Sequence, residues 1–474
     1  MLKYVWASSA HNPRSGLRDI RGTMKELDRC GWWFAAGLLV ALAAVQCILF
    51  SFGYRLTADD VEAHYYALDT VPAFLTYAEH MARVSGRIGH YVTLPISMAA
   101  SYASDYLTAR LAFAAVFFGS FLAFGILLGR LMRMPALTGP LFTAYLVCCP
   151  LLFNHTPPTA YPLQVTLPFL VILLCRIYFI GRENEKAVGL ARLVFLLAIV
   201  GGSEYTLLFA AGVLLVEHLI RNAGNVRGLF RSRFMWADLA TMLVALAIYV
   251  AFRVAVPGEY GGNRPDGIRD LRAVLEILWF HTWNGTIFPY LGVTALTQSW
   301  KIFATAGVLA VLAGAAVLLG PRTFSPGTRL VVVTSVALLL ACLVVMLPPS
   351  TNKRLQDWCT LHNACSYLTS RVAYYFVIPA IFIPIIVSFE RSALALVVAA
   401  IAFLGLSHNW NASLQMRLFV HPYKEAVKLA CTIDPANAQT VLDQPQTMVM
   451  MHPWMDRASY WSRLISHERS RQGC

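Results

Sequence analysis

Three carboxylates stand close together in the segment Thr57-Ala58-Asp59-Asp60-Val61-Glu62. The adjacent Asp59 and Asp60 are unusual beside a long apolar segment, because neighbouring negative charges repel each other and lose hydration there. A carboxylate held within about 3 Å of a hydroxyl can accept its proton, so this pair is the first candidate for a catalytic group. A structural alternative stays open, since Thr57 and Asp60 fit a helix-capping pattern and acidic residues stabilise a helix N-terminus. A helix over residues 59–68 is compatible with both roles.

Basic side chains at three positions are candidates for binding an anionic ligand. Arg87 and His90 follow the acidic pair within Ser85-Gly86-Arg87-Ile88-Gly89-His90-Tyr91. Arg371 begins a later apolar segment, where its guanidinium fork could hold a phosphate at bilayer depth. Each arginine also fits a simpler interpretation, as an interfacial charge whose stem lies along apolar surface. Arg354 is expected to be solvated.

Two further ionisable residues are candidates for binding a substrate. Glu204 lies in an apolar stretch, where acidic side chains are costly and usually mark a site or a buried pair. The alternative is that it simply lies at the water interface. His155, in a short polar segment with Asn154 and Thr156, is the weaker candidate, because a lone histidine in a loop is mostly solvated.

The composition excludes a soluble protein. Hydrophobic residues make up 58% of the 474 residues and charged residues 13%, against about 45–50% and about 25% in soluble chains. The apolar residues occur in blocks near the roughly 20 residues that cross about 30 Å of hydrocarbon. The net charge of +13 is interpreted by the positive-inside rule, not by nucleic-acid binding.

These blocks predict an all-α transmembrane bundle of about eleven spans with a cytoplasmic N-terminus. The predicted spans are residues 32–52, 106–128, 137–153, 161–180, two short helices within 193–220, 236–256, 302–319, 330–347, 372–389 and 393–406. Basic residues flank 193–220 on both sides, which favours a hairpin that turns at Gly201-Gly202-Ser203-Glu204-Tyr205. A single helix is the alternative.

This topology divides the chain into a cytoplasmic segment (1–31), a transmembrane domain (32–407) and a small extracytoplasmic tail (408–474). The first outside loop, residues 53–105, contains the acidic pair. Most polar sequence lies outside, which is where we expect the chemistry.

Four cysteines fall on the predicted outer side, where an oxidising compartment would permit disulfides. A Cys359–Cys365 bridge would close a small loop, and a Cys431–Cys474 bridge is the second pairing considered. Four free thiols are the alternative.

A carboxylate pair in the first outside loop, directly after an N-in first span, resembles the GT-C superfamily of polytopic membrane glycosyltransferases. The number of spans, the interfacial helix in that loop and the outside tail are also similar. The resemblance implies transfer of a sugar from a polyprenyl-phosphate carrier to a glycan, lipid or protein acceptor at the outer face of the cell inner membrane.

The resemblance also implies roles for the candidate residues. Asp59 or Asp60 would be the general base, and the other would orient it or help to bind a divalent cation. The cations Arg87, His90 and Arg371 would bind the donor phosphate, while Glu204 and His155 would contact the substrate. No cofactor is certain.

Two alternatives stay open. An O-antigen ligase or polymerase type of enzyme would depend on outside Arg and His residues instead of an acid pair. A transporter or lipid flippase would place ionisable residues deep within several spans and would contain paired broken helices.

Overall fold

The computed structural model describes residues 36–54, 57–68, 71–152, 156–182, 187–222, 226–258, 268, 270–291, 326–362, 368–388, 391–417, 422–442 and 456–474. These residues form helices joined by turns, and none of them lies in a β-strand. Four of the described helices are long and apolar enough to cross a membrane: α5 (Leu107–Leu131), α11 (Arg233–Ala255), most of α15 (Pro326–Ser350) and α17 (Leu368–Ser388). The all-helical class is confirmed for the described residues, and these four helices support a membrane protein by their length and composition. About eleven spans and the sidedness of the termini remain predictions.

Several helices have other bounds than the predicted spans. Helices α6 (Thr138–Cys148) and α7 (Thr166–Phe179) are shorter than predicted. Helix α6 stops because Cys149 precedes a proline and adopts an extended backbone, as residues before proline usually do. Helix α18 (Arg391–Arg417) is longer and continues past residue 407, where the tail was predicted to begin. The predicted span 302–319 lies outside the described residues.

The predicted break within 193–220 is confirmed. Helix α8 (Ala187–Val200) ends before Gly201, and α9 (Glu204–Arg221) begins after Ser203. The Ser203 backbone N–H donates to Thr206 Oγ1 at 3.1 Å, which satisfies one of the polar groups at the start of α9. The break therefore places Glu204 in the first turn of a helix.

Three short helices lie within the described part of residues 57–103. They are α2 (Ala58–Ala67), α3 (Val71–Ser85) and α4 (His90–Ala103), and α4 packs against both of the others. The helix predicted over residues 59–68 is confirmed as α2.

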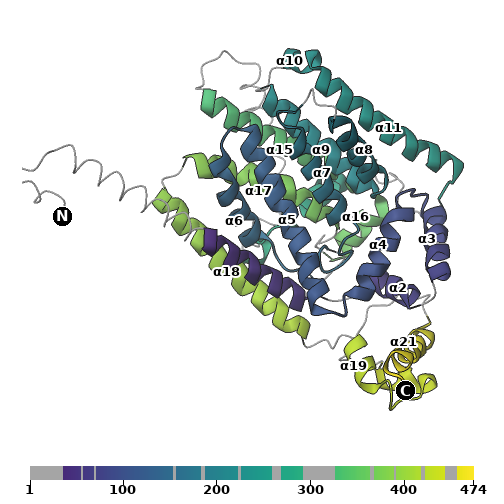
Figure 1. Cartoon of the computed structure of the whole chain (residues 1–474). Helices are drawn as coiled ribbons and strands as arrows, with labels where there is room; N and C mark the ends of the chain where they lie inside the picture. The colour runs from purple at the N-terminus through teal and green to yellow at the C-terminus, as the bar shows by residue number, and fades with distance from the viewer. Residues whose placement is uncertain are drawn as a thin grey trace, which may run out of the picture. The chain divides into compact units, whose positions relative to one another are not determined.

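The centre of the bundle is aromatic. Helix α15 packs against α9 and α17, and α5 packs against α6 and α7 (Figure 1). The Phe121 ring stacks on Tyr145 with ring centres 4.8 Å apart, and Phe169 stacks on Phe209 at 3.9 Å. These contacts hold the helices whose ends carry the site.

A buried ionic cluster joins α7, α9 and α11. The fully buried Arg176 donates to Glu217 at 2.7 Å and to both oxygens of Asp238 at 2.9 and 2.7 Å. The His218 Nε2 atom lies 3.0 Å from the same aspartate. Removing one partner would leave an uncompensated buried charge, which is strongly destabilising. This cluster therefore fixes the ends of these three helices.

Cys431 and Cys474, the weaker of the two pairings considered, form a disulfide that closes the C-terminal segment. Cys359 is also disulfide-bonded, and its predicted partner, Cys365, lies outside the described residues.

Candidate functional site

The start of α2 is fixed by a reciprocal cap. The Thr57 backbone N–H and hydroxyl donate to Asp60 Oδ2 at 3.1 and 2.7 Å, and the Asp60 N–H donates to Thr57 Oγ1 at 3.4 Å. The Tyr161 backbone N–H donates to the other Asp60 oxygen at 3.2 Å. Both oxygens of Asp60 are thus occupied as acceptors. The capping interpretation is correct for this residue.

Burial changes the titration of Asp60. The residue is 1% exposed, and loss of hydration raises the pKa of its carboxyl to about 7 although three hydrogen bonds favour the ionised form. The neighbouring Asp59 adds a like charge in the same direction.

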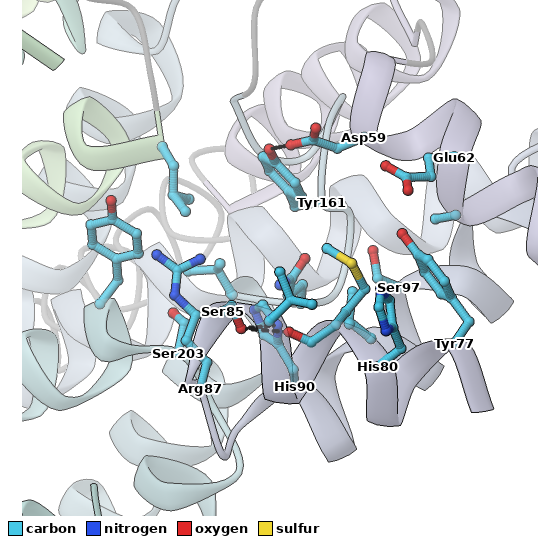
Figure 2. A pocket seen from close by; sticks show the side chains of 18 of the residues that line it. Asp59, Glu62, Tyr77, His80, Ser85, Arg87, His90, Ser97, Tyr161 and Ser203 are labelled. Atoms are coloured by element: carbon cyan, nitrogen blue, oxygen red, sulfur yellow. Dashed lines mark hydrogen bonds between the residues drawn. The ribbon is translucent and has the colours of Figure 1, made fainter. Parts of the chain in front are cut away.

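Asp59 faces a cavity of about 760 Å³. The Tyr161 hydroxyl donates a hydrogen bond to the Asp59 carboxylate (Figure 2). Glu62, one helical turn further along α2, lines the same cavity, because residues three apart share a helix face. Tyr77 lines the cavity beside Glu62 (Figure 2). The pair of carboxylates at the cavity is therefore Asp59 and Glu62.

Other segments complete the cavity wall. Ser85 and His90, at the junction of α3 and α4, lie across from the carboxylates (Figure 2). Arg87 comes from the same junction, and Arg354 comes from α16 (Lys353–His362). The cavity thus combines two carboxylates and two arginines from elements far apart in the sequence.

Arg87 and Glu204 form an ion pair with a separation of 2.6 Å. The Arg87 side chain is 23% exposed and that of Glu204 is 36% exposed, so both remain accessible to a ligand. Arg87 also lines an adjacent cavity of about 440 Å³ together with Glu204 and Arg253. The arginine predicted to bind phosphate and the glutamate predicted to bind substrate are therefore brought together.

His90 is buried and lies 3.0 Å from the Ser85 hydroxyl. Burial, with a smaller effect of Arg87, lowers the pKa of its imidazole to about 4. The ring is neutral at physiological pH, so it can offer a hydrogen bond to a ligand but not the positive charge expected of it.

Arg371 does not line this cavity, although Leu368, three residues earlier in α17, does. Arg371 is 2% exposed, and its guanidinium donates to Cys149 Sγ at 3.2 Å, to the Gly285 carbonyl at 3.3 Å and to the Pro150 carbonyl. These bonds tie α17 to the segments that follow α6 and α12 (Leu271–Asn284). The structure does not bring Arg371 together with the acidic residues, and His155 lies outside the described residues.

Glu62 and Tyr161 were not predicted as site residues, and Arg354 was considered as a cation but expected to be solvated. Glu62 could have been found, because its spacing of three from Asp59 places both on one face of the predicted helix. Nothing near Tyr161 or Arg354 in the sequence indicates a site. Among the described residues, no three His, Cys, Asp or Glu side chains gather as a metal-binding group.

No protein-family model, no curated protein and no solved structure matches this chain.

Proposed function

We propose that the protein is a glycosyltransferase that moves a sugar from a polyprenyl-phosphate carrier to an envelope acceptor at the outer face of a bacterial inner membrane. The observation that carries the proposal is the Asp59 carboxylate, which contacts the Tyr161 hydroxyl and faces a cavity that also contains Arg87 and Arg354. A base and two cations around one cavity are the groups that such a transfer requires.

In the proposed reaction Asp59 is the general base. It takes the proton from an acceptor hydroxyl as that oxygen attacks the anomeric carbon, and the bond from this carbon to the carrier phosphate breaks. Asp60 is the poorer candidate, because its two oxygens already accept hydrogen bonds from Thr57 and Tyr161.

The leaving phosphate departs as an anion and needs positive charge around it. Arg87 and Arg354 supply this charge in the proposal, and Glu204 orients Arg87 through their ion pair. Should the reaction use a divalent cation, Glu62 would provide a carboxylate oxygen of the kind that such ions prefer. The bound cation would then add positive charge near the phosphate.

Asp59→Asn and Asp60→Asn form a matched pair for testing the base. Loss of a general base typically costs about 10²- to 10⁴-fold in rate, so we expect Asp59→Asn to abolish transfer while the protein stays folded and inserted. Asp60→Asn should retain most of the transfer and unfold more easily, because loss of a helix cap costs about 1 kcal/mol.

The measurement compares envelope glycans from cells that produce the wild type, each variant or no protein, followed by transfer assays on membranes with polyprenyl-phosphate sugars. Full transfer by Asp59→Asn would overturn the base assignment. Movement of intact lipid-linked saccharide without a new glycosidic bond would indicate a flippase instead.

A further inference from the structure

Helix α2 has two different faces. Asp59 and Glu62 lie on the face that lines the cavity. Val61, His64 and Leu68 follow the spacing of a second face, and Val61 and His64 are fully buried. Whatever covers this second face determines where the carboxylates of the first face point, because a helix turns as a rigid unit.

The C-terminal helix covers part of the second face, next to α4, whose Ala100 belongs to the same buried cluster. Helix α21 (Arg457–Gln472) contacts α2, and its Tyr460, Trp461 and Leu464 side chains belong to one buried cluster with Val61 and Leu68. This apolar contact excludes water from the side of α2 that faces away from the cavity.

A polar contact between the two helices lies within this apolar cluster. The His64 Nδ1 atom is 3.2 Å from the Tyr460 hydroxyl, and its Nε2 atom is 3.5 Å from the Asp105 carboxylate. All three side chains are buried. A buried hydrogen bond fixes direction as well as distance, so it sets the rotation of α2 about its own axis more sharply than apolar packing does.

The C-terminal segment is itself closed into a unit. The Cys431–Cys474 disulfide links the end of α21 to the turn after α19 (Pro422–Leu429). Across the same junction, Arg469 donates to the Ala430 carbonyl and Gln472 to the Val427 carbonyl, each at 2.8 Å. Helix α21 is therefore held by its own segment while it contacts α2.

We propose that the C-terminal segment positions α2, with His64 and Tyr460 as positioning residues for the Asp59 carboxylate. The consequence for the reaction rests on the proposed function, whereas the restraint of α2 does not. Displacement of a reacting group by about 1 Å can cost 10²-fold in rate, so a segment that never touches substrate controls turnover.

Tyr460→Phe removes the hydroxyl and keeps the ring, so it tests the polar contact with little change in packing. Its matched control is Tyr106→Phe, which removes a hydroxyl that accepts from Arg471 of the same helix α21 at 3.3 Å and leaves the His64–Tyr460 contact in place. The double variant Cys431→Ser/Cys474→Ser opens the unit and leaves the disulfide of Cys359 intact.

Hydrogen–deuterium exchange of the full-length protein in nanodiscs measures the restraint directly. The loss of one buried hydrogen bond should speed exchange of the α2 amides by about fivefold in Tyr460→Phe. The double cysteine variant should show the same effect, whereas Tyr106→Phe should match the wild type. In transfer assays kcat should fall about fivefold in Tyr460→Phe with KM unchanged. The assays use equal amounts of folded enzyme, so a smaller yield of folded protein would not lower kcat.

Wild-type exchange of α2 in Tyr460→Phe, or equal acceleration in Tyr106→Phe, would overturn the positioning role. Absence of transfer in the wild type would count against the proposed function alone, since the exchange experiment needs no substrate.

Discussion

Asp59 and Asp60 are neighbours in the chain, yet their carboxylates have different surroundings. Successive residues of an α-helix are rotated by about 100°, so one carboxylate faces the cavity and the other turns back to the Thr57 cap. The cap fixes the first turn of α2 and with it the direction of Asp59. Asp60 thus has a structural role that supports its neighbour.

Asp60 predicts a specific pH dependence of stability. The folded protein raises the pKa of this carboxyl from 3.8 to about 7, so the folded state binds a proton more tightly than the unfolded chain. The contribution to stability is fully present below pH 3.8 and is lost as pH rises through about 7. The measurement is the melting temperature of the wild type minus that of Asp60→Asn, taken from pH 5 to pH 8. This difference should become several degrees smaller as the pH rises. A constant difference would contradict this.

The acidic segment was recognised from the sequence, but the residues that act together were only partly predicted. Adjacent charges in an apolar context identified Asp59, while the partner at the cavity, Glu62, follows from helical rotation. Arginine is a residue type that binds phosphate, yet the guanidinium of Arg371 donates its hydrogen bonds to the carbonyls of Pro150 and Gly285. Sequence patterns do not reveal such contacts, because they join segments distant along the chain.

At the scale of elements, the α3–α4 junction meets the α8–α9 break. A Cβ atom at Gly89 would lie 1.5 Å from the Gly202 carbonyl oxygen, so the two backbones approach as closely as they do because residue 89 is glycine. This approach brings Arg87 and Glu204 together from opposite sides of the contact.

Gly89→Ala should separate these two turns. Backbone atoms have little room to move, so we expect a loss of about 1–3 kcal/mol in stability. Transfer should also fall markedly, because the Arg87–Glu204 pair would be separated. Gly119→Ala is the matched control, since a Cβ there, inside α5, meets nothing within 4 Å and should stabilise by about 0.5–1 kcal/mol. Thermal unfolding and transfer assays on both variants test this prediction. Equal stability and equal transfer in the two variants would refute the role of Gly89 in the close approach.

The elements were predicted unevenly for physical reasons. The break at Gly201 and the helix after Asp59 were anticipated, because glycine pairs and capping residues act locally. The lengths of α6, α7 and α18 were not, since they depend on a proline boundary and on packing. The Arg176 cluster was also missed, because its members come from three separate helices.

At the scale of the whole molecule, the cavity and the ionic cluster lie at opposite ends of α9. Glu204 is in its first turn and Glu217 lies just before its last turn, a separation of about 20 Å along the axis. The site is therefore supported at one end of the bundle while buried charges fix the other end.

Helix α11 is held by polar contacts near both of its ends. Asp238 binds Arg176 near its start, and near its end the Tyr249 hydroxyl donates to the Ile199 carbonyl at 2.9 Å. Arg253 donates to the Ser85 carbonyl. Within the part of the chain that the structure describes, only 11% of the apolar window of α11 is buried.

These contacts make α11 sensitive to bilayer thickness. Asp238 and Arg253 are separated by about 22 Å of helix, less than the hydrocarbon core of about 30 Å. Because both ends are anchored within the fold, α11 has little freedom to change its tilt when the bilayer becomes thicker or thinner. Stability in vesicles should therefore change with the acyl-chain length of the lipid, and Tyr249→Phe, which loosens one anchor, should weaken that dependence. The thickness and composition of the surrounding lipid then become conditions of the protein's activity.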